Sequence, residues 1–212
     1  MRFLKVLAVL LAYPSEPLAA ASGELRQAIQ AEPGLAGTDR AALRSLVVEI
    51  EQGDLLERQA RYSGWFDHGR ATSLNLFEHL HGESRERGPA MVELKALYAR
   101  HGLSLASIEL PDALPVFLEF LSTQPRDVAR LQLRDAADAI RAIGEALAVR
   151  RSPYAAVPQV LLSIAGVAGL SARPVLPPEP PPDAEWAEAP VSFGAPQGVV
   201  SQVMRFVRRG RG

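Results

Sequence analysis

The chain has 212 residues and no cysteine. Without thiols it cannot form disulfides, bind zinc or an iron–sulfur cluster through thiolates, or use a cysteine nucleophile. It also has only two lysines, Lys5 and Lys95, and neither belongs to a glycine-rich phosphate-binding loop. The glycine pattern of dinucleotide-binding folds and the G-x-S-x-G turn of hydrolases are absent too. These absences exclude the commonest enzyme frameworks.

An excess of one charge is also missing. The formal net charge is −1 and the pI is about 6.4, so no global attraction to nucleic acid or to an anionic membrane is expected. No apolar run approaches the roughly 18 residues that span a bilayer, which argues against stable membrane insertion. Hydrophobic residues make up 48% of the chain, enough for one domain with a sizeable core.

The first apolar run, MRFLKVLAVLLAYP, admits two interpretations. It has the charged start and short apolar stretch of a secretory signal peptide. However, Pro14 interrupts the run, and Glu16 stands where signal peptides prefer small neutral residues. Helical spacing also relates its apolar positions, namely Phe3, Val6, Leu7, Leu10 and Leu11. We therefore favour a buried first helix in a cytoplasmic protein.

Helical periodicity dominates the rest of the chain, and no strand-like alternation persists. Apolar residues recur at helical spacing in four segments. These are Leu43, Leu46, Val47 and Ile50; Leu114, Phe117, Leu118 and Leu121; Ala136, Ile140, Ile143 and Leu147; and Val157, Val160, Leu161 and Ile164. The pattern predicts an all-α fold, a single multi-helix bundle of about nine helices.

Caps and breakers support these helices. Ser152–Pro153 is typical of a helix start, and Pro125 is expected in the first turn of another helix. Gly102 follows Arg100 and His101 as a helix stop would. Gly82 and Gly88–Pro89 predict that two helices meet near residues 82 to 89.

The composition changes near residue 173. Residues 173–198 hold eight of the seventeen prolines and carry one Arg against four acids, a charge of −3. Residues 199–212 hold four Arg and no acid, a charge of +4. We predict a helical domain over residues 1–172 and a flexible acidic and proline-rich tail with a basic tip over residues 173–212. The valines and arginines of the tip could alternatively fold against a partner or touch anionic lipid.

The histidines do not suggest a metal site. His79 and His81 lie two residues apart, which separates them by about 200° around a helix. Ser84 lies near His81 and Glu83, but a Ser–His–acid site requires convergence in space that proximity in sequence does not supply. Neither a metal site nor a hydrolytic triad is predicted.

The segment from 73 to 88, SLNLFEHLHGESRERG, holds the most specific signal. It begins as an amphipathic helix and ends in four charges of alternating sign between two glycines. This pattern fits a salt-bridged connection between helices, or a polar rim beside an apolar groove that accepts a peptide helix. Similarly, Asp112 either caps a helix beginning near Ala113 or, with Glu109, adds negative charge at the edge of a groove.

Several segments resemble the nitrate reductase delta-subunit family of NarJ-type assembly chaperones. The resemblance rests on Leu10–Leu11, Tyr13–Pro14, Tyr62, Phe66–Asp67, Gly69–Leu74, Leu76–His79, His81–Arg85, Arg87–Gly88, Ala90–Leu94, Ile108–Asp112, Leu114–Pro115, Leu118–Glu119, Ser152–Ala155 and Glu188–Phe193. It covers nearly the whole chain. One departure is Ala113, where such proteins often have a histidine after the Pro–Asp pair, so no role of that imidazole can be transferred.

The resemblance implies a cytoplasmic, all-α chaperone that is not an enzyme and keeps no cofactor of its own. Such proteins bind the N-terminal segment of the apo catalytic subunit of respiratory nitrate reductase, assist molybdenum cofactor insertion and delay membrane docking. Cofactor delivery proteins are further implied partners. The expected peptide-binding residues are Leu74, Phe77, Glu78, His81, Glu83, Ser84, Arg85, Arg87, Glu109, Asp112, Leu114 and Phe117. Two alternatives remain open: a chaperone for another molybdoenzyme, such as a dimethyl sulfoxide or trimethylamine oxide reductase, and a small all-α enzyme.

Overall fold

The computed structural model describes residues 1–67, 69–81, 87–105 and 109–171. Within these ranges the chain forms eleven α-helices and two short 3₁₀ helices. They are α1 (Phe3–Leu10), α2 (Glu16–Ala20), α3 (Ser22–Ala31), α4 (Gly37–Glu51), α5 (Leu55–Phe66), η1 (Arg70–Thr72), α6 (Leu76–His81), α7 (Arg87–Arg100), α8 (Leu114–Thr123), α9 (Arg126–Asp135), α10 (Ala137–Val149), η2 (Pro153–Ala155) and α11 (Ala156–Ala165).

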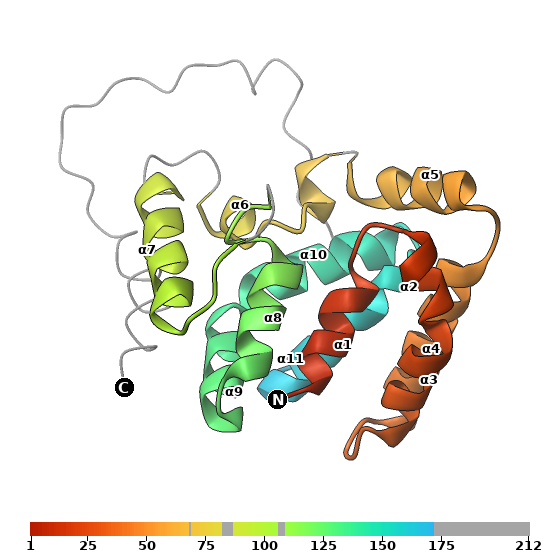
Figure 1. Ribbon diagram of the computed structural model, residues 1–212, viewed down its shortest axis with the longest axis horizontal. Coiled ribbons are helices and arrows are strands. Elements are labelled where there is room, and N and C mark those ends of the chain that lie inside the picture. The colour runs from red at the N-terminus through yellow and green to blue at the C-terminus, as the bar shows by residue number, and fades with distance from the viewer. Residues whose placement is uncertain (68, 82–86, 106–108, 172–212) are drawn as a thin grey trace.

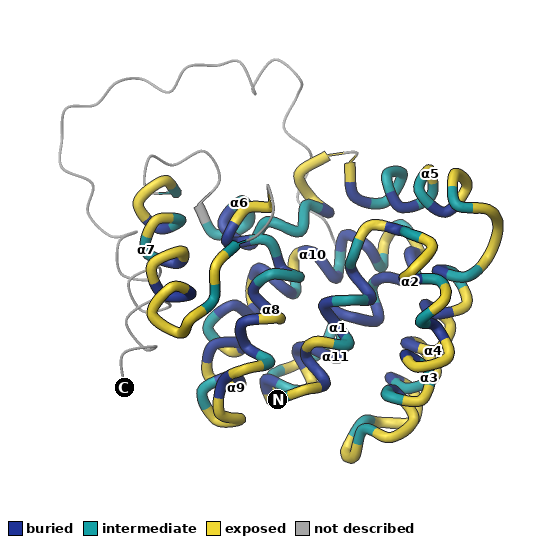
Figure 2. Tube along the Cα trace, viewed as in Figure 1, coloured by how far each residue is buried: buried dark blue, intermediate teal, exposed yellow. Residues whose placement is uncertain are grey.

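The helices form one bundle, and the all-α prediction is confirmed. Figure 1 shows α7 on one side of the molecule and α3 with α4 on the other, with α1, α8, α10 and α11 between them. Helix α11 packs against α10, α9 and α4. Figure 2 shows the buried residues gathered on the central helices, while α7 and the outer faces of α3 and α4 are largely exposed. The described residues contain two more α-helices than predicted, since α2 and α6 are too short to show clear periodicity.

The predicted apolar stripes form the core. All four residues of the stripes on α4, on α8 and at Ala136–Leu147 are buried, as are the first three of the stripe on α11. Ile164, the last residue of that stripe, is only half-buried. The first helix is also confirmed as a buried element, because α1 packs along α8 and buries Leu4, Leu7 and Leu10 completely.

Two of the predicted helix boundaries agree closely with the structure. After α7, Gly102 adopts a φ of +73°, and the N–H of Leu103 donates to the carbonyl of Tyr98 at 3.0 Å. This is the Schellman arrangement, in which glycine is favoured because it has no side chain to clash. The Ser152 hydroxyl accepts the N–H of Tyr154 at 3.3 Å and begins η2, which leads into α11. Pro125 precedes α9 as its N-cap and is not in its first turn.

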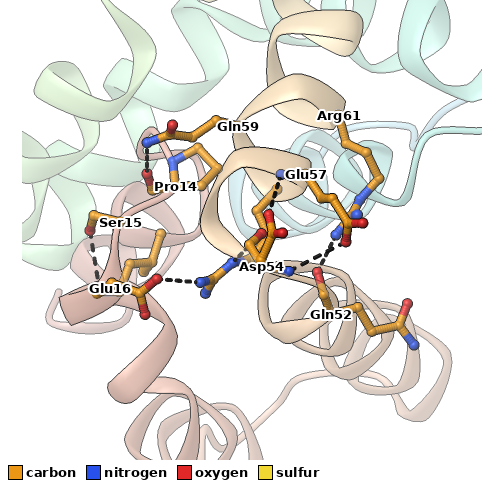
Figure 3. A network of polar contacts seen from close by, with 10 residues as sticks. Pro14, Ser15, Glu16, Gln52, Asp54, Glu57, Gln59 and Arg61 are labelled. Atoms are coloured by element: carbon orange, nitrogen blue, oxygen red, sulfur yellow. Dashed lines mark hydrogen bonds and ion pairs between the residues drawn. The ribbon is translucent and has the colours of Figure 1, made fainter.

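A polar network fixes helix α5 (Figure 3). A capping box closes its start, because the N–H of Glu57 donates to Asp54 Oδ1 at 2.9 Å and Glu57 Oε2 accepts the N–H of Asp54 at 3.3 Å. Arg58 binds Glu16 of α2 at 2.7 Å, and the amide of Gln59 donates to the carbonyl of Pro14 at 3.1 Å. These bonds hold α5 against the turn between α1 and α2, and thereby place the aromatic residues near its end.

Candidate functional site

The two segments that define the expected site meet in the structure. Asn75 and Ala113 form an isolated antiparallel β-bridge. The N–H of Leu76 donates to the carbonyl of Asp112 at 3.0 Å, and the N–H of Leu114 donates to the carbonyl of Leu74 at 2.8 Å. We call this contact between residues 73–78 and 110–114 the motif junction. It ties the start of α6 to the start of α8.

Asp112 lies at the centre of the motif junction and is completely buried. Its Oδ2 atom accepts the N–H of Phe77 at 3.1 Å, so it caps α6. Of the two alternatives for Asp112, the one in which it caps the helix beginning near Ala113 is wrong, because Ala113 precedes α8 without any side-chain cap. Burial raises the pKa of the Asp112 carboxyl, and the N–H of Phe77 and the positive charge of Arg87 offset only part of this effect.

Glu78 carries the accessible negative charge of α6. Its Oε1 atom accepts hydrogen bonds from Arg87 Nη2 at 3.0 Å and from Asn75 Nδ2 at 3.1 Å. Burial acts to raise the pKa of Glu78, but hydrogen bonds from Ser73, Asn75 and Arg87 outweigh it and hold the pKa below its ordinary value. Glu78 is therefore ionised at neutral pH, and its side chain is 22% exposed.

A cluster of aromatic rings joins three further segments that resemble the family. Tyr62 of α5 packs edge-on against Tyr13 at 5.3 Å between ring centroids, and against Tyr154 at 5.7 Å. Phe66 contacts both Tyr62 and Tyr154. The Tyr62 hydroxyl donates to the carbonyl of Leu11 at 2.8 Å, which anchors the ring to the end of α1. Such edge-to-face pairs stabilise more than the buried area alone suggests.

The surface beside this cluster is acidic and partly apolar. Burial raises the pKa of the Tyr62 phenol most, and its electrostatic interactions with Tyr154, Asp67 and Glu109 raise it further. Asp67 and Glu109 are both exposed. Tyr13 is 54% exposed, and Leu110, which follows Glu109 in the sequence, is 38% exposed, so both residues offer accessible apolar surface.

Arg150 of the segment after α10 binds the last turn of α5. Its Nη2 atom donates to the carbonyl of Gly64 at 2.6 Å, and its Nη1 atom donates to the carbonyl of Trp65 at 2.9 Å. The guanidinium also lies over the Trp65 ring, 5.5 Å from the ring centroid. A cation near the last carbonyls of a helix is favourable, so Arg150 fixes the position from which Phe66 and Asp67 project.

The expected apolar groove residues lie in the core. Phe77, Leu114 and Phe117 have no exposed surface, whereas Leu74 is half-buried and packs against the core. Glu78, Arg87 and Asp112 are brought together at or next to the motif junction, and Glu109 is exposed. Glu83, Ser84, Arg85 and the tail from residue 173 onward lie outside the described residues, as does the side chain of His81.

Sequence reasoning missed the residues that connect these segments. Tyr98 of α7 donates from its hydroxyl to the carbonyl of Pro111 at 2.8 Å and holds the loop before Asp112. His79 Nε2 donates to the carbonyl of Ser73 at 2.8 Å, so this ring closes the turn before α6. The buried Tyr62, Phe66 and Tyr154 belong to segments that resemble the family, but no spacing along the chain links them.

Two further findings concern metals and membranes. In the parts of the chain that the structure describes, no three acidic or histidine side chains gather as a metal-binding group. Across the same ranges, no helix combines the length and apolar character needed to cross a bilayer.

These features define an all-α protein in which the motif junction and the aromatic cluster each bring together segments that lie far apart in the sequence. A family model described as the nitrate reductase delta subunit matches residues 15–157. The chain is 44% identical over 165 residues to the nitrate reductase molybdenum cofactor assembly chaperone NarJ of Escherichia coli K12, covering 78% of this chain and 70% of that protein. The chain therefore belongs to the nitrate reductase delta subunit family.

Other similarities agree with this membership. The chain is 40% identical over 166 residues to NarW of Escherichia coli K12, described as a probable chaperone of the same kind, covering 78% of this chain and 69% of that protein. A candidate redox enzyme maturation protein from Archaeoglobus fulgidus shares the fold, with a TM-score of 0.56 and 21% identity over 78% of this chain and 93% of that chain. The relatives are assembly chaperones, which confirms the expectation that the chain is not an enzyme.

Proposed function

We propose that this protein is a dedicated cytoplasmic chaperone for the maturation of respiratory nitrate reductase. It binds the N-terminal segment of the apo catalytic subunit, holds that subunit while the molybdenum cofactor is inserted, and delays its docking at the membrane. The chaperone leaves the finished enzyme and keeps no cofactor. Proteins that deliver the cofactor are its transient partners during this step.

The observation that carries this proposal is the motif junction together with the surface beside it. Segments that are far apart in the sequence meet at the Asn75–Ala113 bridge. Glu78 and Leu110 belong to this junction and Glu109 directly precedes it, whereas Tyr13 belongs to the aromatic cluster and Asp67 follows Phe66 of that cluster. The three acids supply negative charge, and Tyr13 and Leu110 supply accessible apolar surface. An amphipathic peptide with basic residues complements such a surface in both charge and hydrophobicity.

The burial of the expected groove residues refines which side chains would contact the peptide. Phe77, Leu114 and Phe117 have no exposed surface, so they could contact a ligand only if neighbouring residues moved. In this proposal they pack beneath the binding surface and do not contact the peptide. We assign the direct contacts to Tyr13, Leu110 and the acids that remain accessible. In this assignment Glu83, Ser84, Arg85 and His81 remain candidate contacts at the adjoining segment.

The maturation role is tested by the state of the enzyme in cells. Deleting the gene for this protein should leave nitrate reductase catalytic subunit that lacks molybdenum cofactor, and expressing the full chain should restore cofactor content. Measuring molybdenum and pterin in the purified enzyme reports this directly. Normal cofactor content in the deletion strain would contradict the proposal.

A chaperone for a different molybdoenzyme is the second candidate. The segment around Asp112 fits that class as well, but the similarity to nitrate reductase chaperones covers more than three quarters of the chain. Cofactor content of dimethyl sulfoxide and trimethylamine oxide reductases, measured in the same deletion strain, separates the two. A loss of molybdenum cofactor from those two reductases, with normal cofactor content in nitrate reductase, would favour the second candidate.

A further inference from the structure

We infer that Asp112 is a positioning residue for partner binding: it holds the first turn of α6 in place and does not itself contact the partner. This inference rests on the proposed function, because it concerns how the peptide-binding surface is held. Asp112 is then a buried residue that orders the binding surface, and it is not a charged contact at the edge of a groove.

The hydrogen bonds of Asp112 are those of a helix cap supplied from elsewhere in the chain. The first N–H groups of a helix have no acceptor within the helix. Helix α6 has six residues, and Asp112 satisfies two of these donors, Leu76 through its carbonyl and Phe77 through its carboxylate. Asp is among the best N-cap residues when it precedes its own helix. Here Asp112 makes the same kind of capping hydrogen bond, although it lies 35 residues from Phe77 in the sequence.

Asn75, the residue that precedes α6, does not cap this helix with its side chain. Asn75 is a type that often caps helices through its side-chain oxygen. In this structure its Nδ2 atom instead donates to Glu78 Oε1 at 3.1 Å. Asn75 thus orients the carboxylate of Glu78, and the capping of α6 falls to Asp112.

The burial of Asp112 separates it from any partner. It has no exposed surface, and the loop before it is fixed by the bond from Tyr98 to Pro111. Its Oδ1 atom is buried and has no hydrogen-bond partner among the described residues. Burial keeps the pKa of this carboxyl raised, which weakens it as an anionic contact. Solvent reaches Glu78 of the junction and its partner Arg87 of α7 instead.

The consequence is that Asp112 fixes the first turn of α6, from which Glu78 projects. If the cap is lost, the first turn of α6 is free to fray, and Glu78 loses its fixed orientation relative to Arg87. Binding would then weaken through loss of an ordered surface, although no contact to the partner has been removed. A neutral side chain that keeps the acceptor oxygen should preserve this order.

The test compares Asp112→Asn with Asp112→Ala by calorimetric titration with the N-terminal peptide of the nitrate reductase catalytic subunit. Asp112→Asn should bind within about twofold of the wild type, because its side-chain oxygen still accepts the N–H of Phe77. Asp112→Ala should bind roughly 3- to 30-fold more weakly, the range that corresponds to loss of a helix cap. Hydrogen exchange at the amide of Phe77 should be slow in wild type and Asp112→Asn and fast in Asp112→Ala.

Glu78→Gln is the matched control, because it neutralises the accessible carboxylate of the junction with little change of shape. We expect it to weaken binding where Asp112→Asn does not. Equal losses in Asp112→Asn and Asp112→Ala, with the Phe77 amide still protected in Asp112→Asn, would show that the charge of Asp112 meets the partner and would overturn the inference. An unchanged affinity of Asp112→Ala would overturn it too.

Two further results must be distinguished from these outcomes: an Asp112→Ala variant that does not fold, and a wild-type chain that does not bind the peptide. If Asp112→Ala does not fold, Asp112→Ser takes its place, since its shorter hydroxyl reaches the Phe77 amide less well and should give an intermediate loss in affinity and protection. Full affinity in Asp112→Ser with an unprotected Phe77 amide would contradict the inference. If the wild-type chain binds no peptide, the proposed function itself fails, whereas a loss of affinity in Asp112→Asn as large as that in Asp112→Ala, with the Phe77 amide still protected, contradicts the positioning role alone.

Discussion

Arg87, the first residue of α7, donates to Glu78 of α6 across 3.0 Å. The ion pair links the two ends of segment 82–86, and both side chains are more than 70% buried. A partly buried ion pair contributes more to folding stability than a fully exposed one, because water screens the attraction between its charges less.

The Glu78–Arg87 pair should show a measurable coupling energy. We expect a double-mutant cycle of Glu78→Gln and Arg87→Gln in urea unfolding to give a coupling of about 0.5–1 kcal/mol. The same cycle at Asp138 and Arg141, a pair at 3.4 Å in which the Asp138 side chain is 92% exposed, is the control and should give less. Equal couplings at the two pairs would show that the junction pair does not tie α6 to α7.

Phe117 should behave as a core residue and not as a groove contact. Phe117→Ala removes a fully buried ring from α8 and should lower the free energy of unfolding by about 3–5 kcal/mol. Leu110→Ala is the control, because Leu110 is 38% exposed and its truncation should cost less than about 1 kcal/mol. Urea unfolding measures both. A Phe117 variant with near wild-type stability would place that ring outside the core.

Arg150 should stabilise the end of α5 through its fork of donors. Arg150→Met removes the hydrogen bonds to the carbonyls of Gly64 and Trp65, a longer one to Thr72 Oγ1, and the contact with the Trp65 ring, and should cost about 1–3 kcal/mol of folding stability. Arg150→Lys should recover only part of this, since an ammonium cannot reach both carbonyls in the same geometry. Trp65 lies under the guanidinium, so a shift in tryptophan fluorescence should accompany the loss. Full recovery by lysine would contradict the bidentate role.

The raised pKa of Asp112 predicts a dependence of stability on pH. The folded chain keeps this carboxyl protonated to a higher pH than the unfolded chain does, so it binds more protons between the two pKa values. The stability of wild type relative to Asp112→Asn should therefore be greatest below pH 3.8, the ordinary value, and fall as the pH rises through the folded pKa. Urea unfolding of both proteins from pH 3 to pH 7 measures this. A difference that rises with pH would mean that the folded state favours the ionised form.

Local patterns predicted the helices of the core well, since one apolar stripe marks the buried side of one helix. The stripe from Leu43 to Ile50 is an example, and its residues are buried as expected in α4. Helix α6 was harder to define, because its six residues hold too few apolar repeats. The glycine stop at Gly102 was predictable because the whole motif lies within a few residues.

The site was predicted in its segments but not in its contacts. The capping of α6 by Asp112 joins residues 35 apart, and the nearer helix at Leu114 was the natural expectation. The aromatic cluster joins Tyr13, Tyr62 and Tyr154, which share no periodicity. Spacing along one helix also cannot distinguish a side chain that lines a groove from one that is buried, as Phe77 and Phe117 show.

The most direct test of the chaperone function is calorimetric titration of the full chain with the N-terminal peptide of its nitrate reductase catalytic subunit. We predict saturable one-to-one binding that weakens with rising salt and weakens further in the Asp67→Asn, Glu109→Gln double variant, with a scrambled peptide as control. Peptide binding that is equally strong in the double variant would contradict the placement of the acidic surface. No heat of binding and no saturation with the authentic peptide would contradict the account itself.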